Sequence, residues 1–202
     1  MDCTETTIYP VILPVSEKEQ GHKGREKVRF LSRHARAALR RSCQQIGVTL
    51  EALPKDDQGV PLPVNGVYWS LSHKSAIVGG VASRKPIGLD LETIRPVRDG
   101  LLDKVADETE WRLAGAKDER TFFRFWTAKE SVLKAVGKGM AGLSYCRILA
   151  VMDDNHMILT YGNVQWPVAH CWFGNHVAAI ASHHFLIDWS LPSAWEYHDL
   201  ER

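Results

Sequence analysis

Apolar side chains recur at steps of three, four or seven residues in the segment 122–139, FFRFWTAKESVLKAVGKG. This spacing is typical of an α-helix with one apolar face. Charged side chains, among them Lys129, Glu130 and Lys134, fall mostly off the apolar stripe. Glu130 and Lys134 are one turn apart and can share a face. The segment therefore predicts an amphipathic helix whose polar face carries either a functional pair or an ordinary solvated ion pair.

Residues 86–92, PIGLDLE, alternate apolar and polar positions, which indicates a β-strand with Asp90 and Glu92 side by side on one face. Two neighbouring carboxylates oppose each other's ionisation unless a cation lies between them. If Glu130 joins them from the helix, three acidic groups converge and a divalent ion can hold them together. All-oxygen ligation favours Mg²⁺ or Mn²⁺ over zinc. The alternative is an edge strand whose polar face meets water.

Helical spacing also extends over residues 17–46, as one or two helices, and over residues 99–119. The side chains expected to point inward are Val28, Leu31, Ala35, Ala38 and Leu39 in the first segment and Leu101, Leu102, Val105, Trp111 and Leu113 in the second. The first segment precedes a group of predicted strands, and the second leads into the predicted helix of residues 122–139.

Strand patterns occur over residues 6–15, 67–72, 76–83, 86–92, 147–152, 157–161, 168–173, 177–182 and 185–190. Pro10 and Pro14 interrupt the first of them, which predicts an edge strand. The three strands between residues 67 and 92 have tight links and are expected to form an antiparallel meander. Two further hairpins are expected between residues 147 and 182.

The order of elements predicts an α+β fold in two halves, residues 1–95 and 96–202. Each half is expected to pack helices on a small antiparallel sheet, and the first ends on IGLDLE where the second ends on FLIDWS. This parallel suggests a duplicated unit with the ligand site at its junction, on pattern rather than sequence identity.

The composition is that of an ordinary globular protein, with 202 residues, 45% hydrophobic and 24% charged. No apolar run is long enough for a membrane span, and the first residues lack the features of a signal peptide. The four cysteines, Cys3, Cys43, Cys146 and Cys171, form no CxxC pair. We therefore expect a cytoplasmic protein with free thiols and no zinc site.

The net charge of +1 argues against general nucleic-acid binding, but residues 18–41 carry nine Lys and Arg against two Glu. This segment has a net charge of +7, so the remainder of the chain sums to −6. Such an asymmetry suggests a local anionic ligand or an acidic protein partner, and a solvated helix face is the alternative.

His73 follows a predicted strand and lies between Ser72 and Lys74, just before the acidic strand. A single histidine is often only a surface or core residue. Its polar neighbours here favour a contact with an anion.

These motifs together resemble the 4′-phosphopantetheinyl transferase superfamily, whose pattern is G-x-D-x-E followed by W-x-x-K-E-x-x-x-K-x-x-G. The matching positions are Gly88, Asp90, Glu92, Trp126, Lys129, Glu130, Lys134 and Gly137. The segment SLSHK resembles the family's N-x-S-H element, and the segment around Glu110 resembles an acidic helix element between the two motifs. The resemblance covers residues 58–142. One departure is Gly59-Val60-Pro61, where many members have G-K-P and thus a phosphate-binding lysine.

The length resembles the surfactin-type subgroup, in which two halves are fused into a monomer. The resemblance implies that a carrier protein's serine attacks the β-phosphate of coenzyme A, takes up phosphopantetheine and releases adenosine 3′,5′-bisphosphate. The implied partners are coenzyme A and an apo acyl or peptidyl carrier protein, without nucleic acid or membrane. The carrier's pathway stays open among fatty acid, polyketide, nonribosomal peptide and polyunsaturated-lipid biosynthesis.

The resemblance also implies roles for single residues. Asp90, Glu92 and Glu130 would hold Mg²⁺ against the pyrophosphate, and Lys134 would reach the phosphates or protonate the leaving group. Ser72 and His73 would bind the 3′-phosphate, and Lys129 would support the site or contact the adenine. The base is left open between Glu130, Glu92 acting through water, and Glu110.

Val60 stands where many family members have a phosphate-binding lysine. The basic segment 18–41 would supply that positive charge, best from Lys27 or Arg36. Carriers of this class tend to be acidic, so the same segment could serve as a docking surface. Trp195 and Tyr197 in the tail could dock on the body or on a partner. Two alternatives stay open, namely a coenzyme A-binding module without transfer and another Mg²⁺-dependent phosphotransferase.

Overall fold

The computed structural model describes residues 6–98, 100–183 and 185–193. The helices in these ranges are α1 (Glu17–Gln20), α2 (Gly24–Gln45), α3 (Leu102–Val105), α4 (Glu108–Ala114), α5 (Glu119–Ala135) and the 3₁₀ helix η1 (Met140–Tyr145). The strands are β1 (Thr6–Ile8), β2 (Val11–Pro14), β3 (Tyr68–His73), β4 (Ile77–Ser83), β5 (Gly88–Thr93), β6 (Cys146–Val151), β7 (His156–Tyr161), β8 (Val164–Phe173), β9 (His176–Ala181) and β10 (Phe185–Ile187). Helices combined with mostly antiparallel strands confirm the predicted α+β class.

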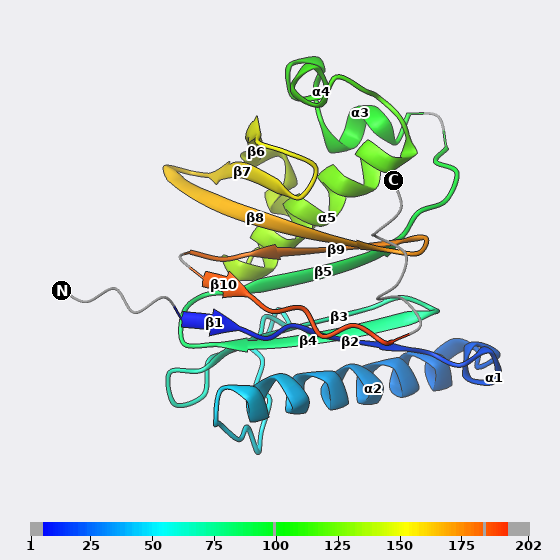
Figure 1. Cartoon of the computed structure of the whole chain (residues 1–202), viewed down its shortest axis with the longest axis vertical. Helices are drawn as coiled ribbons and strands as arrows, with labels where there is room; N and C mark the ends of the chain where they lie inside the picture. The colour runs from blue at the N-terminus through cyan, green and yellow to red at the C-terminus, as the bar shows by residue number, and fades with distance from the viewer. Residues whose placement is uncertain (1–5, 99, 184, 194–202) are drawn as a thin grey trace.

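Two sheets lie between the two long helices (Figure 1). Helix α2, in blue at the bottom of the view, covers a three-stranded sheet with the order β2-β4-β3. Helix α5 packs on a five-stranded sheet with the order β5-β9-β8-β7-β6, mainly against β5 and β9. Strands β3 and β4 lie against β5, and a buried apolar cluster fills the space between the sheets. Strand β5, which carries the acidic motif, therefore contacts both the three-stranded sheet and helix α5.

Helix α2 approaches its sheet closely because β4 presents a glycine to it. A Cβ atom on Gly80 would lie 2.4 Å from the backbone nitrogen of Leu39. Four of the predicted inward residues, Leu31, Ala35, Ala38 and Leu39, are buried. Val28 is exposed, so its prediction is wrong, since it lies in the first turns of the helix before the first buried position.

Strand β2 lies at the edge of the three-stranded sheet, as its prolines predict. The predicted three-strand meander is wrong in its last member, because β4 is paired with β2 and β3 on its two edges and has no place for β5. Strand β5 instead pairs antiparallel with β9. The two predicted hairpins, β6–β7 and β8–β9, are confirmed.

The other edge of β5 faces β3 and is satisfied by side chains rather than by a strand. The backbone N–H of Leu89 donates to Ser70 Oγ at 2.9 Å, and that of Leu91 donates to Ser72 Oγ at 3.2 Å. Unpaired backbone groups are costly when buried, so these two hydroxyls allow β5 to lie inside the protein beside a strand that it does not pair with.

Strands from the two predicted halves pair with each other in two places. β5 pairs with β9, and β1 pairs in parallel with β10. The sheets of the described residues have two, three and five strands, so a duplicated plan is not confirmed. The boundary at residue 95 stays a prediction. Leu101 and Leu113 are exposed rather than inward, because α3 and α4 are short and turn one face to the core.

No helix in the described ranges is both long and apolar enough to cross a membrane. Cys43, Cys146 and Cys171 are free cysteines, as predicted. Cys3, Trp195 and Tyr197 lie outside the described residues.

Gly88 is expected to be essential for stability, because it sets the distance between β5 and α5. A Cβ atom there would lie 1.8 Å from the carbonyl oxygen of Ser131 and 2.7 Å from the nitrogen of Ala135. Overpacking of this kind costs about 1–3 kcal/mol and sometimes more. We expect Gly88→Ala to lower the free energy of unfolding by at least about 2 kcal/mol in urea titrations followed by tryptophan fluorescence.

Gly139→Ala is the matched control, since a Cβ there would have no neighbour within 4 Å and the residue has an ordinary φ of −82°. Equal unfolding midpoints for the two variants would contradict the close contact between β5 and α5.

Candidate active site

A cavity of about 300 Å³ opens between the end of β3 and the polar face of α5. Its lining residues are Leu71, Ser72, His73, Lys74, Asp90, Trp126, Glu130, Lys134 and Met140. Five of the residues predicted from the motifs are among them, and they come from three elements: β3, β5 and α5. The structure thus brings together the two motifs and the histidine segment.

Asp90 lies at the floor of this cavity and is only 3% exposed. Its Oδ1 accepts hydrogen bonds from Ser72 Oγ at 3.0 Å and from Lys134 Nζ at 2.7 Å. Lys134 Nζ also donates to the carbonyl oxygen of Leu89 at 3.0 Å, which ties α5 to β5. Asp90 Oδ2 is buried and has no hydrogen-bond partner among the described residues.

Glu130 provides the second carboxylate oxygen that has no hydrogen-bond partner. Its Oε1 is buried and is without a partner in the described part of the chain. Burial raises the pKa of Glu130, and the neighbouring Asp90 raises it further, while Lys134 and Lys74 act in the opposite direction. Two carboxylates that disfavour each other's charge, each with an open oxygen, form a site that a cation would stabilise. The donors are hard oxygens, which suit Mg²⁺ or Mn²⁺.

Glu92 is held differently, although it is equally buried at 3% exposure. Its Oε1 lies 2.6 Å from Lys74 Nζ and its Oε2 lies 3.4 Å from Arg95 Nη1. It lines a neighbouring cavity of about 360 Å³. Across the described ranges, no three His, Cys, Asp or Glu side chains are arranged to hold a metal ion. The trio of Asp90, Glu92 and Glu130 is therefore not preassembled, and Glu92 as a third ligand stays a prediction.

His73 stands at the mouth of the cavity among positive charges. Its pKa is lowered by desolvation first, and then by the charges of Lys134, Lys74 and Lys55. A phosphate at this mouth would be attracted by the lysines and would favour the charged imidazole. The position of His73 thus fits the predicted contact with an anion.

Sequence reasoning missed Lys55. Lys55 forms a β-bridge with Pro61, so it lies across a small hairpin from the position where the family pattern expects a lysine and this chain has Val60. Asp56 Oδ1 accepts from the backbone nitrogens of Gln58 and Val60 and fixes this turn. The turn residues DDQG were a signal that could have pointed to Lys55.

Lys27 and Arg36 do not line the cavity. The sheet-facing side of α2 is taken by apolar residues such as Ala35 and Leu39, so Arg36 faces outward. It lines a separate cavity of about 340 Å³ together with Arg40. Their predicted contact with coenzyme A stays a prediction.

Lys129 is buried rather than off the apolar stripe, because it lies four residues before Leu133 on the inner face of α5. Its Nζ is 2.8 Å from Glu110 Oε1, which also accepts from the backbone nitrogen of Ile148 at 2.8 Å. Glu110 Oε2 accepts from the backbone nitrogen of Asp107. Glu110 is thus saturated by structural contacts and unsuited to act as a base. Lys129, through this pair, supports the site by fixing the rotation of α5.

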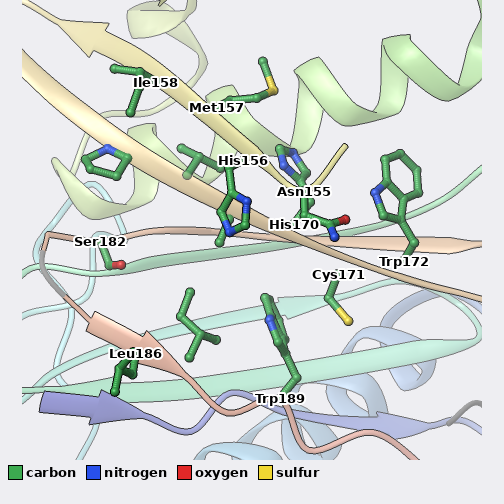
Figure 2. A pocket seen from close by; sticks show the side chains of 14 residues that line it. Asn155, His156, Met157, Ile158, His170, Cys171, Trp172, Ser182, Leu186 and Trp189 are labelled. Carbon is green, nitrogen blue, oxygen red and sulfur yellow. The ribbon is translucent and has the colours of Figure 1, made fainter. Parts of the chain in front are cut away.

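A larger cavity, of about 720 Å³, lies elsewhere, on β7 and β8 beside β10 (Figure 2). Cys171, Leu186 and Trp189 are among the residues that line it. It contains none of the predicted site residues. The converging motif residues, and not cavity size, identify the candidate site.

His170 on β8 is buried against α5, away from the candidate site. Its Nε2 lies 3.1 Å from the carbonyl oxygen of Arg124, and its Nδ1 has no partner among the residues that the structure describes. Burial lowers the pKa of His170 to about 4, and the charge of Arg124 adds to this effect.

Comparison with known proteins gives a consistent result. A family model described as the 4′-phosphopantetheinyl transferase superfamily matches residues 86–181. The chain is 32% identical over 90 residues to 4′-phosphopantetheinyl transferase gsp of Aneurinibacillus migulanus, which is 43% of this chain and 38% of that protein. It is 32% identical over 111 residues to 4′-phosphopantetheinyl transferase HetI of a Nostoc species, covering 52% and 47%. For 4′-phosphopantetheinyl transferase Sfp of Bacillus subtilis strain 168, identity is 33% over 78 residues, covering 37% and 35%.

The chain thus spans less than half the length of each of these relatives. The matched segment contains β5 and α5, which carry the carboxylates and Lys134 of the candidate site. These matches bear out the predicted superfamily over residues 86–181, and the surfactin-type group stays a prediction.

Stability is expected to fall in acid because of His170. The pKa of its ring is about 4 in the folded chain, below its ordinary value of 6.5. The stabilisation of the neutral ring is fully present above pH 6.5 and is lost as the pH falls toward 4, where the unfolded chain binds the proton first. Between pH 7 and pH 4 we expect the free energy of unfolding to fall less in His170→Gln than in the wild type. The difference should be up to about 3 kcal/mol, measured by urea unfolding at each pH.

His34→Gln on α2 is the control, because that ring is at the surface. Parallel pH profiles for the wild type and His170→Gln would show that burial of His170 does not shape the acid response.

Proposed function

Because the chain belongs to the 4′-phosphopantetheinyl transferase superfamily through residues 86–181, we propose that it transfers 4′-phosphopantetheine from coenzyme A to a serine of an apo acyl or peptidyl carrier protein. The observation that carries this proposal is the convergence of Asp90, Glu130 and Lys134 in one cavity, with His73 at its mouth. Phosphoryl transfer depends mainly on positioning and on cations that stabilise charge on the phosphoryl oxygens. The cavity offers both.

The serine oxygen forms a bond to the β-phosphorus, the bond between that phosphorus and the bridging oxygen breaks, and adenosine 3′,5′-bisphosphate leaves. Lys134 is fixed by Asp90 and by the carbonyl oxygen of Leu89, so its charge is held near the phosphates. Lys74 and Lys55 add positive charge at the mouth, where His73 would meet the 3′-phosphate.

A divalent cation fits the open oxygens of Asp90 and Glu130, which are the residues that would hold it. When bound, Mg²⁺ or Mn²⁺ would polarise the phosphoryl group and neutralise charge on the leaving oxygen. The role of this chain is to keep both carboxylates at one cavity, each with a buried oxygen that no described group occupies.

The serine proton needs an acceptor. Glu110 is saturated by structural contacts, and Glu92 is engaged by Lys74 and Arg95. Glu130 lines the cavity, and no described cation pairs with it directly. We therefore assign proton acceptance to Glu130, through the carboxylate oxygen that the cation would leave free.

The finer features rest on the resemblance. We propose a cytoplasmic monomer of the two-half plan that serves fatty acid or polyketide biosynthesis, with no nucleic-acid or membrane partner. A second candidate is a coenzyme A-binding module without transfer. The intact set of Asp90, Glu130 and Lys134 favours transfer over binding alone.

The proposal predicts a mass gain on a carrier protein. We expect the purified chain, incubated with coenzyme A, Mg²⁺ and a panel of apo carriers, to add one phosphopantetheine to at least one of them, read by intact mass. Asp90→Asn and Glu130→Gln should each reduce the rate by about 10²–10³-fold, the loss typical of removing an electrostatic contact to a transition state.

Glu51→Gln is the matched control, because Glu51 is exposed and lines the outer cavity beside α2. Circular dichroism should show that all variants are folded. Tight binding of coenzyme A without modification of any carrier would favour the binding module, and near-normal rates in either site variant would refute the assigned roles.

A further inference from the structure

The three acidic residues of the site are not equivalent. Glu92 has both carboxylate oxygens next to protein cations, Lys74 at 2.6 Å and Arg95 at 3.4 Å. Asp90 Oδ2 and Glu130 Oε1 have no partner among the described residues. Lys74, which is paired with Glu92, lines the same cavity as Asp90 and Glu130.

The ion pair between Lys74 and Glu92 is held from both sides. The backbone nitrogen of Lys74 donates to the carbonyl oxygen of Ile77 at 2.8 Å, which fixes the turn between β3 and β4. Glu92 lies on β5, whose register with β9 is continuous through this position. A protein is strongly destabilised when a buried charge loses its partner. Separation of Lys74 from Glu92 is therefore unfavourable.

We infer that Lys74 takes the place of a divalent cation at Glu92, so that the cation of this site is bound by Asp90 and Glu130 without Glu92. The positive charge of Lys74, which lies at the cavity, also lowers the affinity of the site for a second cation. This inference rests on the proposed function only in assuming that a divalent cation binds at the cavity.

The structure favours this arrangement over one in which Lys74 moves away and Glu92 becomes a third ligand. Asp90 Oδ1 already accepts from Lys134, which also donates to the carbonyl oxygen of Leu89. If Lys74 left Glu92, the carboxylate oxygens remaining for it at the cavity would be the open ones that the cation itself would use. Lys74 therefore has its best partner where it is, and Glu92 acts as an anchor for Lys74.

The test is Mn²⁺ binding to the full chain without coenzyme A or carrier, measured from the free-Mn²⁺ signal in electron paramagnetic resonance. Asp90→Asn should weaken binding at least about 10-fold, because charged ligand number sets affinity at such sites. Glu92→Gln alone would release Lys74 toward the open oxygens, so Glu92 is tested in a chain without that lysine: the double variant Lys74→Met, Glu92→Gln should bind Mn²⁺ within about 2-fold of the wild type, because neither side chain is a ligand.

Removal of Lys74 alone should have a different effect. Lys74→Met frees Glu92, and we expect tighter Mn²⁺ binding by about 5–10-fold, a gain that Glu92→Gln then abolishes in the double variant. Lys55→Met is the matched control, because it removes a lysine charge at the same mouth that has no contact with Glu92. It should change the dissociation constant less than about 2-fold.

Lys74→Gln, which keeps a donor for Glu92, replaces Lys74→Met if the latter does not fold. The inference is overturned if the double variant Lys74→Met, Glu92→Gln binds Mn²⁺ as weakly as Asp90→Asn does, or if neither the wild type nor the Lys74 variants bind Mn²⁺. Carrier modification is measured separately, so a failure of the proposed transfer leaves this result readable, and the reverse also holds.

Discussion

The position of strand β5 is the constraint on which the rest of this structure depends. One of its edges is paired with β9, and the other is satisfied by the hydroxyls of Ser70 and Ser72. Its Gly88 allows α5 to approach to backbone contact. Because the strand is fixed in three directions, Asp90 and Glu92 are buried next to the face of α5 that carries Glu130 and Lys134. The hydroxyl of Ser72 joins architecture and chemistry directly, since it accepts from the backbone of β5 and donates to Asp90.

Burial of several like charges in so small a space is tolerated because each carboxylate is balanced differently. Asp90 has Lys134, Glu92 has Lys74 and Arg95, and Glu110 on the other side of α5 has Lys129. Only Glu130 is without a direct cation among the described residues, and burial raises its pKa. The protein has thus distributed its own positive charges so that the unbalanced negative charge remains at the cavity, where a ligand can reach it.

Local patterns in the sequence were sufficient for most elements and for most of the site. The periodicity of residues 122–139 gave α5, the alternation in PIGLDLE gave β5, and the spacing of the two motifs gave Asp90, Glu130 and Lys134. The partner of β5 could not be found in this way, because its pairing with β9 is set by competition for strand edges across the whole chain. The role of Lys74 was also missed, since an ion pair between β5 and the turn after β3 exists only once the two sheets face each other. Lys129 shows a second limit of sequence reasoning. It is a charged residue at an apolar helical position, and it is buried because Glu110 neutralises it. The sequence around either residue does not indicate that the two are paired.

The pairing of β1 with β10, and of β5 with β9, has a consequence for how the protein reaches its native state. Thr6 is in register with Phe185, and Gly88 with Ala181, so strands that leave the ribosome early must wait for partners that emerge near the end of synthesis. Contacts of such long sequence separation form slowly and leave strand edges uncovered in the meantime. The nascent chain therefore carries its acidic strand exposed until the last sheet is translated, which makes this interval the one in which a chaperone would be most useful.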